Sequence, residues 1–206
     1  QAWVRGYQGN DLSADTTLMA CVKHYALYGA AEAGRDYNTV DMSRVTAMNY
    51  YMRPYQAAVE AGVGSIMTSF NEFESIPATG NTWLLNDVLR KQWGFNGFVV
   101  SDFTAIAEMV NHGIGNSQEV GVKALKAGVD MDMIADCYHA VLKKSLEEGK
   151  ITEAKIDSAC RRILIAKYQL GLFHDPYKYC NPKRAAKEFL SVNNVSAARR
   201  IAAESF

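Results

Sequence analysis

The sequence has no net charge, few prolines and no long apolar run, and each shortage excludes a class of protein. Lysine and arginine number 22 against 22 aspartates and glutamates. A chain without surplus positive charge lacks the field that attracts nucleic-acid phosphates, so we expect no nucleic-acid partner. No apolar run reaches the ~18 residues of a membrane span. Four prolines and fifteen glycines are too few for a collagen-like or low-complexity chain.

The sequence also lacks recognisable metal-binding and nucleotide-binding motifs. No GxGxxG or P-loop is present, which removes the usual phosphate-binding loops. The run Asp136-Cys137-Tyr138-His139 contains two potential metal ligands only two positions apart, without further partners at zinc-like spacing, so we expect no metal site. The cysteines form no CxxC pair, and their spacing favours none of the three disulfide pairings that four cysteines allow. They are Cys21, Cys137, Cys160 and Cys180.

The composition is that of an ordinary globular protein. Hydrophobic residues make up 49% and charged residues 21% of the 206 positions, which is enough for a sizeable core. The length exceeds a small domain but falls short of an α/β barrel of ~250 residues. The chain starts at Gln1 without a signal segment and stops at Phe206 within a helical pattern. We therefore expect a processed chain or a piece of a longer one.

Short β-branched runs alternate with longer segments of helical period, which predicts parallel β-α units. The run 98–101 is apolar throughout, as in strands buried on both faces. Four such units form a small open sheet or half of an eight-stranded barrel, and the pattern does not choose between them. Expected strands are 19–22, 65–68, 98–101 and 129–133; expected helices are 43–62 with a break at Pro54, 81–93, 106–111, 117–127, 138–148 and 152–170.

Ligands of both candidate folds bind at the carboxyl ends of the strands, and polar residues stand there in this sequence. Asp102 follows the apolar strand 98–101, which suits a rigidly held nucleophile or general base, or equally an N-cap of the next helix. Lys23 and His24 follow the first strand and are either hydrogen-bond donors to a ligand or a surface pair. Asp130 and Asp132, in the fourth strand, are carboxylates at a ligand edge or turn residues.

The segments taken in order resemble glycoside hydrolase family 3, and the bacterial β-glucosidase branch most of all. Any one segment is a weak signal, whereas the ordered series is specific and runs along nearly the whole chain. The segments are 22–25 (VKHY), 34–43 (GRDYNTVDMS), 64–71 (GSIMTSFN), 83–90 (WLLNDVLR), 93–102 (WGFNGFVVSD) and 127–133 (AGVDMDM).

The resemblance implies a retaining, exo-acting β-glycosidase on a (β/α)₈ barrel that is followed by an α/β sandwich domain. The fold class expected for this chain is therefore α/β, with four β-α units forming the C-terminal half of a TIM-like barrel. Residues 1–173 would be the partial barrel, and 174–206 an extension leading towards the sandwich domain. Four strands would leave two open sheet edges, so we expect the isolated chain to be incomplete and inactive.

The resemblance also implies roles for individual residues. Asp102 matches the nucleophile of the family's Ser-Asp motif, and Lys23 and His24 match the pair that binds hydroxyls of the sugar in subsite −1. Further walls of that subsite are implied at Arg35 and Met67. Neither a metal nor an organic cofactor is implied.

The sequence departs from the family pattern at three places. Phe70 stands where many relatives have Tyr, and Phe103 where Trp often follows the nucleophile. The acid/base Glu is usually supplied by the sandwich domain, so we expect it outside this chain; nothing matches Glu72 or Glu74 to that role. Tyr28 occupies the position of the catalytic His of the N-acetylhexosaminidase branch, which argues against that branch.

The expected ligands are β-linked glucosides or oligosaccharides, and the expected protein partner is the remainder of the barrel with its sandwich domain. A β-xylosidase or another exo-β-glycanase of the family is the closest alternative. A non-catalytic four-stranded sugar-binding module, complete as it stands, is the alternative from another class. The family resemblance suggests a periplasmic or secreted protein.

Overall fold

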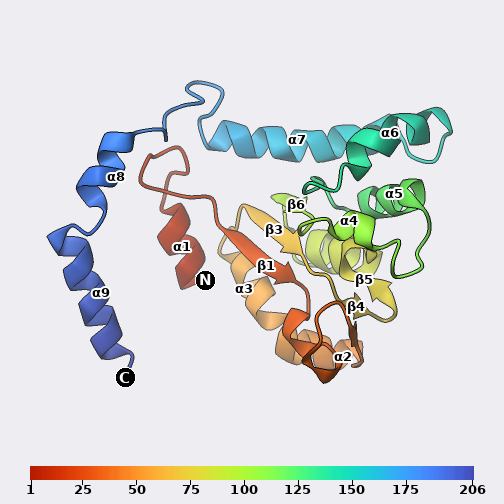
Figure 1. Cartoon of the computed structure of the whole chain (residues 1–206), viewed down its shortest axis with the longest axis horizontal. Coiled ribbons are helices and arrows are strands. Elements are labelled where there is room, and N and C mark those ends of the chain that lie inside the picture. The colour runs from red at the N-terminus through yellow and green to blue at the C-terminus, as the bar shows by residue number, and fades with distance from the viewer. The chain divides into compact units, whose positions relative to one another are not determined.

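The computed structural model describes all 206 residues and divides them into two units, Gln1–Leu170 and Gly171–Phe206. The first unit is built around a parallel sheet of three strands in the order β1-β3-β6. They are β1 (Cys21–Tyr25), β3 (Ser65–Thr68) and β6 (Phe98–Val100). Figure 1 shows β1 and β3 side by side with their arrowheads pointing the same way. Parallel strands separated by helices confirm the predicted α/β class.

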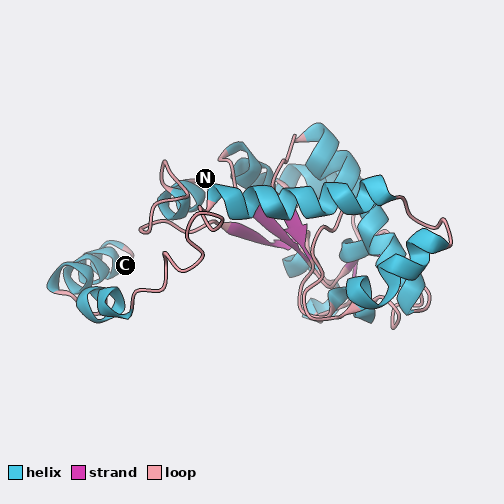
Figure 2. Ribbon diagram, turned by 90° about the horizontal axis from the view of Figure 1, so that it is seen from above, coloured by secondary structure: helices cyan, strands magenta, loops and turns pink.

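Helices fill the connections between these strands. The long helix α7 packs against β6 and crosses the strands in Figure 2, and α5 packs against α6 and α7. The α-helices of this unit are α1 (Ala2–Gln8), α2 (Arg44–Thr46), α3 (Arg53–Glu60), α4 (Ala105–Glu108), α5 (Ser117–Ala127), α6 (Cys137–Glu147) and α7 (Glu153–Gln169). Three short 3₁₀ helices are η1 (Tyr28–Ala30), η2 (Glu32–Gly34) and η4 (Ala78–Gly80), and two π-helices are η3 (Ala47–Tyr51) and η5 (Trp83–Gln92).

The core lies between the sheet and the apolar stripe of η5. Ile66 at the centre of β3 and Val99 at the centre of β6 are fully buried and adjacent in register. Tyr25, at the end of β1, is also fully buried, and its hydroxyl donates to the carbonyl of Leu84 at 2.9 Å. This bond ties β1 to η5 and satisfies a phenol that would otherwise be costly to bury.

The helix expected over residues 43–62 is divided, as Pro54 predicts. Ser43 caps α2, since its hydroxyl accepts from the Thr46 amide at 3.1 Å. The π-helix η3 follows. After it, α3 begins with Pro54 in its first turn, where the N–H that proline lacks would have no partner within the helix. Gly62 comes just after α3 with a φ of 79°, a conformation that glycine adopts without strain.

Two strand predictions are corrected by the structure. The first strand spans Cys21–Tyr25 instead of 19–22, so Lys23 and His24 lie within it and not after it. The fourth expected strand, 129–133, is reduced to a single bridge between Met131 and Val100. Backbone and side-chain bonds both join it to the neighbouring chain: the amides of Asp130 and Met131 donate to Val99 O at 2.8 and 3.0 Å, and Ser101 Oγ accepts from the Met133 amide at 2.8 Å. The segment therefore follows β6 without forming a regular strand.

A second small sheet, which the sequence did not predict, has the order β2-β4-β5. Its strands are β2 (Thr39–Val40), β4 (Glu72–Phe73) and β5 (Ile76–Pro77). Each has two residues, too few for a period-2 pattern to be recognised. The carboxylate of Glu72 accepts from Thr39 Oγ1 at 2.9 Å and lies 2.6 Å from His112 Nδ1. These contacts connect the small sheet to the loop between α4 and α5.

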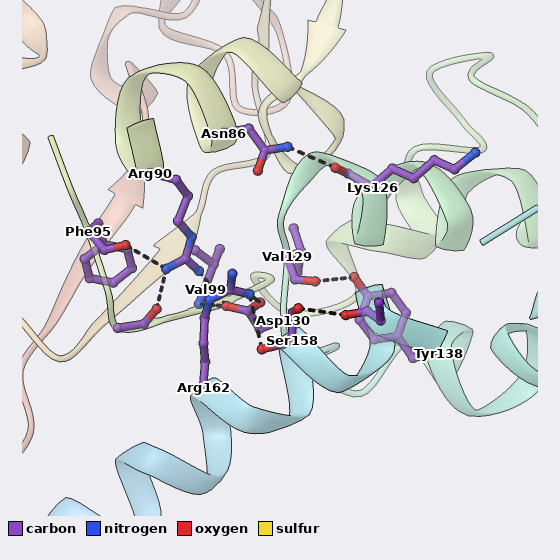
Figure 3. Close-up of polar contacts among 12 residues, drawn as sticks. Asn86, Arg90, Phe95, Val99, Lys126, Val129, Asp130, Tyr138, Ser158 and Arg162 are labelled. Atoms are coloured by element: carbon purple, nitrogen blue, oxygen red, sulfur yellow. Dashed lines mark hydrogen bonds and ion pairs between the residues drawn. The ribbon is translucent and has the colours of Figure 1, made fainter. Parts of the chain in front are cut away.

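Asp130 is buried among basic side chains and does not face the carboxyl edge of the sheet as a free carboxylate (Figure 3). One of its oxygens accepts from Arg90 Nη2 at 2.7 Å and from the Val99 amide at 2.8 Å. The other accepts from Arg162 Nη1 at 2.7 Å. Burial lowers the pKa of Arg90 to about 10, although Asp130 opposes this shift. The group thus joins η5, β6 and α7, and its role is structural.

Gln8 fastens α1 to the start of the sheet. Its side-chain amide donates to Gly62 O at 2.9 Å and accepts from the amides of Ala20 and Gly64 at 3.1 and 2.9 Å. We expect Gln8→Ala to lower the free energy of unfolding by about 2–3 kcal/mol, because the Gly62 carbonyl and the amides of Ala20 and Gly64 lose their hydrogen-bond partner where they are partly buried. Urea unfolding measures this. Gln92→Ala, at an exposed glutamine, is the control, and equal midpoints for the two variants would contradict the assignment.

The second unit consists of α8 (Pro182–Glu188) and α9 (Val192–Glu204). Each begins at a polar cap: Asn181 accepts from the amides of Lys183 and Arg184, and Ser191 accepts from Asn194. Neither helix buries a residue. Across both units, no helix combines the length and apolar character that crossing a bilayer requires.

Candidate active site

The structure brings His24 and Asp102 together at the carboxyl edge of the main sheet. His24 lies in β1 and Asp102 follows β6, on opposite sides of the central strand β3. The two side chains nevertheless meet, with His24 Nε2 3.3 Å from Asp102 Oδ2. They are 26% and 13% exposed, so both are accessible from one side only. Two polar groups that the sequence analysis proposed separately therefore belong to one site.

The carboxylate of Asp102 is held in a fixed orientation. Its Oδ1 accepts from the Phe103 amide at 2.7 Å, which leaves Oδ2 towards His24. The preceding residue is fixed too, since the Ser101 amide donates to Met131 O at 2.9 Å. The alternative of a helix cap does not apply, because the N-cap of α4 is Thr104. Asp102 is thus a rigid, partly exposed carboxylate.

The surroundings of His24 favour its neutral form. Burial lowers the pKa of its imidazole, and the neighbouring Lys23 adds to that effect. The carboxylates of Asp102 and Asp36 act in the opposite direction, but burial is the largest cause. A neutral imidazole donates from one nitrogen and accepts at the other, so His24 can bind a hydroxyl group in either sense.

Aromatic rings surround this pair of residues. The Tyr28 ring lies 4.9 Å from the His24 ring and 6.2 Å from that of Phe70, measured between centroids. Phe70 in turn stacks on Tyr37 at 4.6 Å. Phe103, next to the nucleophile candidate, is 57% exposed. The sequence predicts no role for Tyr37, and it singles out Tyr28 only as a departure from the N-acetylhexosaminidase branch. Both residues lie in the loop 26–41, and its two tyrosines are the sequence feature that points to them.

The remaining predicted residues have less contact with this centre. Lys23 is an exposed residue of β1, directly before His24. Met67 is half-buried in the central strand, opposite Val100. Arg35 lies in an exposed loop, and its side chain makes no hydrogen bond or ion pair with Asp102 or His24. The structure therefore brings His24 and Asp102 together, with Phe70 linked to His24 through Tyr28 and Phe103 bonded to Asp102 by its backbone amide, and leaves Arg35 outside these contacts.

The glutamates that follow β3 are engaged elsewhere. Glu74 is bound by the Arg44 guanidinium at 2.6 and 2.8 Å, and this hydrogen bonding lowers the pKa of Glu74. Glu72 is occupied by His112 and Thr39. Neither is placed as a free acid beside Asp102. No three His, Cys, Asp or Glu side chains are grouped so that they could hold a metal ion, and all four cysteines are free thiols.

Comparison with known proteins identifies the family of this chain. The model of the glycosyl hydrolase family 3 N-terminal domain matches residues 1–166. The chain is 45% identical over 186 residues to the periplasmic beta-glucosidase of Salmonella typhimurium, covering 90% of this chain and 24% of that protein. It is 38% identical to a beta-xylosidase of Formosa agariphila, over 84% of this chain and 25% of that protein.

A solved structure is similar along almost the entire chain. The beta-glucosidase from Listeria innocua superimposes with a TM-score of 0.92 at 44% sequence identity, over 97% of this chain and 28% of that one. The chain thus spans about a quarter of the length of the relatives it matches. With the ordered motifs, the parallel strands and the family model all in agreement over residues 1–166, the chain belongs to glycosyl hydrolase family 3.

Proposed function

We propose that this chain supplies the nucleophile and part of the sugar-binding subsite of a retaining, exo-acting β-glucosidase. The single observation that carries the proposal is the rigid Asp102 carboxylate, which points one oxygen at an imidazole 3.3 Å away. A retaining glycosidase needs such a carboxylate to attack the anomeric carbon. Family membership supports glycoside hydrolysis as the reaction.

Each residue has a defined task in the proposed reaction. An Asp102 carboxylate oxygen bonds to the anomeric carbon while the bond from that carbon to the leaving-group oxygen breaks. The leaving-group oxygen takes a proton from an acid. The acid is a carboxyl group ~5 Å away, and we propose that it lies in polypeptide outside residues 1–206, in a sandwich domain. Water then hydrolyses the glycosyl ester. Lys23 and His24 donate to the sugar hydroxyls and orient the ring.

We propose terminal β-D-glucosyl residues as the substrate class, with Met67, Phe70, Phe103 and Arg35 forming walls of the site. The relative of 45% identity is named a beta-glucosidase, and a D270A mutant of the Listeria beta-glucosidase was solved with laminaribiose. A β-xylosidase is the second candidate, favoured by the 38% identity to an enzyme of that name. A xyloside lacks one hydroxymethyl group, so the two substrates differ at a single contact.

We also propose the organisation and the location of the protein. Residues 1–173 would belong to the barrel, and 174–206 would lead towards the sandwich domain. The relatives include a periplasmic beta-glucosidase from Salmonella typhimurium and a periplasmic beta-glucosidase/beta-xylosidase from Dickeya chrysanthemi. We therefore propose a periplasmic or secreted protein.

A mechanism-based label tests the function directly. The complete protein is incubated with 2,4-dinitrophenyl 2-deoxy-2-fluoro-β-glucoside. Its fluorine slows both formation and hydrolysis of the glycosyl ester, while the good leaving group speeds formation alone, so the ester accumulates. Peptide mass mapping should find the sugar on Asp102, and Asp102→Asn should take up none. A label on another carboxylate overturns the assignment. Faster labelling by the corresponding xyloside favours the xylosidase, and no label from either sugar favours a non-catalytic sugar-binding module.

A further inference from the structure

We propose that Tyr28 is a positioning residue that holds the His24 imidazole against Asp102, an inference that rests on the proposed function. The phenol ring lies between two other rings, 4.9 Å from His24 on one side and 6.2 Å from Phe70 on the other. His24 meets Asp102 at 3.3 Å. Tyr28 does not touch Asp102 itself, so its effect passes through His24.

The imidazole needs such a support because its own strand does not provide one. His24 is half-buried, and its only ion pair is with Asp102. The backbone carbonyl of His24 is fixed by the Tyr55 hydroxyl at 2.6 Å, which positions the main chain but leaves the side-chain torsions free. A flat ring packed at 57° to the imidazole restricts those torsions.

Tyr28 is itself secured at its two ends. Its ring belongs to an aromatic row that continues through Phe70 to Tyr37, whose rings are 4.6 Å apart. Its hydroxyl faces the Asp36 carboxylate. Burial, followed by that carboxylate, raises the pKa of Tyr28, so the phenol stays protonated and donates towards Asp36. The Asp36 carboxylate is in turn held by the Tyr37 amide at 2.9 Å.

The loop that carries Tyr28 is thereby coupled to the reaction centre. Misplacing a substrate-orienting group by about 1 Å can cost ~10²-fold in rate. Loss of the Tyr28 ring should therefore lower kcat more than it raises KM, since the hydrogen bonds from His24 strengthen in the transition state. Loss of a residue that only stabilises the fold would leave kcat and KM of the remaining folded enzyme unchanged.

Kinetics of the complete protein with 4-nitrophenyl β-glucoside separate these cases. We expect Tyr28→Leu to lower kcat/KM by about 10- to 100-fold, and Tyr28→Phe, which keeps the ring, to restore most of it. In a His24→Ala background, Tyr28→Leu should change kcat/KM less than about 2-fold, because the interaction it serves is already lost. Tyr50→Leu, at an exposed tyrosine, is the control. If the loss of kcat/KM in the double variant equals the product of the losses in the two single variants, the proposal is overturned.

An NMR titration of His24 tests the contact without using activity. The groups that face His24 are Asp102, Lys23 and Asp36, and burial sets the direction of its shift. Removing the covering ring in Tyr28→Leu admits water and should raise the pKa of His24 towards its ordinary value. Tyr50→Leu, at an exposed tyrosine outside the aromatic row, should leave it unchanged. An unchanged pKa in Tyr28→Leu refutes the contact, whereas a wild-type protein without glucosidase activity refutes the function alone.

Discussion

Asp102→Asn is expected to lower kcat for aryl β-glucosides by about 10⁴-fold or more, which is the scale seen when a nucleophile is removed from a covalent mechanism. The amide oxygen can still accept from the Phe103 amide, which now bonds to Asp102 Oδ1 at 2.7 Å, so the local fold should persist. An amide does not form the glycosyl ester. KM should change little, because Lys23 and His24 still bind the sugar. Steady-state kinetics of the complete protein measure both constants.

Two further variants sharpen this result. Asp136→Asn removes an exposed carboxylate that pairs only with His139 at 3.2 Å, and it should leave kcat unchanged. Asp102→Gly opens space for azide, which would attack the anomeric carbon in place of the carboxylate. Because only one displacement then occurs, the product should be the α-glycosyl azide. Wild-type rates in Asp102→Asn, or a β-glycosyl azide from Asp102→Gly, would rule out Asp102 as the nucleophile.

Asp130→Ala is expected to lower the free energy of unfolding by about 3–5 kcal/mol, the usual cost of removing one partner from a buried ion pair. Two arginines depend on this carboxylate, which lies 2.7 Å from each guanidinium (Figure 3). Its side chain is 2% exposed, so water does not replace it easily. The Val99 amide also loses its acceptor. Denaturant unfolding followed by circular dichroism measures the change.

The matched control for this variant is Asp87→Ala. Asp87 forms an ion pair with Lys91 at 2.7 Å, but both side chains are largely exposed, and surface pairs contribute less than about 1 kcal/mol. A second comparison uses Arg162→Met, which also breaks the group and should destabilise less than Asp130→Ala, because Arg90 keeps its partner. If Asp130→Ala and Asp87→Ala unfold at the same denaturant concentration, the Asp130 group does not stabilise the fold.

Local patterns were sufficient for most elements of the first unit. The strand Ser65–Thr68 and the helix Ser117–Ala127 have the bounds that their sequences predict. Both depend on nearest-neighbour information: an apolar β-branched run in one case, and in the other a polar N-cap followed by helical period. The helix at 117 begins with a capping box between Asn116 and Glu119, which is complete within four residues.

Where prediction was wrong, the deciding contacts join residues far apart in the sequence. The expected strand 129–133 forms only a bridge with Val100, and the side chains of Ser101 and Asp130 each accept from a backbone amide of the facing segment. The strand β1 extends through Tyr25, which pairs with Thr68 of β3 and whose buried phenol bonds to the carbonyl of Leu84. None of these contacts is visible in the local pattern of apolar and polar residues.

For the site, too, the sequence determined some features and the tertiary structure others. The ordered motifs alone indicated the family, the α/β class and Asp102 with Lys23 and His24 as the reacting and binding groups, because those residues stand in short contiguous runs. Only the tertiary structure showed that His24 touches Asp102, that Tyr28 packs on that imidazole, and that Asp130 is enclosed by two arginines. The meeting of His24 and Asp102 follows from the sheet order β1-β3-β6, which brings residues about 80 positions apart to one edge, and the Asp130 group depends on the packing of η5 and α7 beside β6.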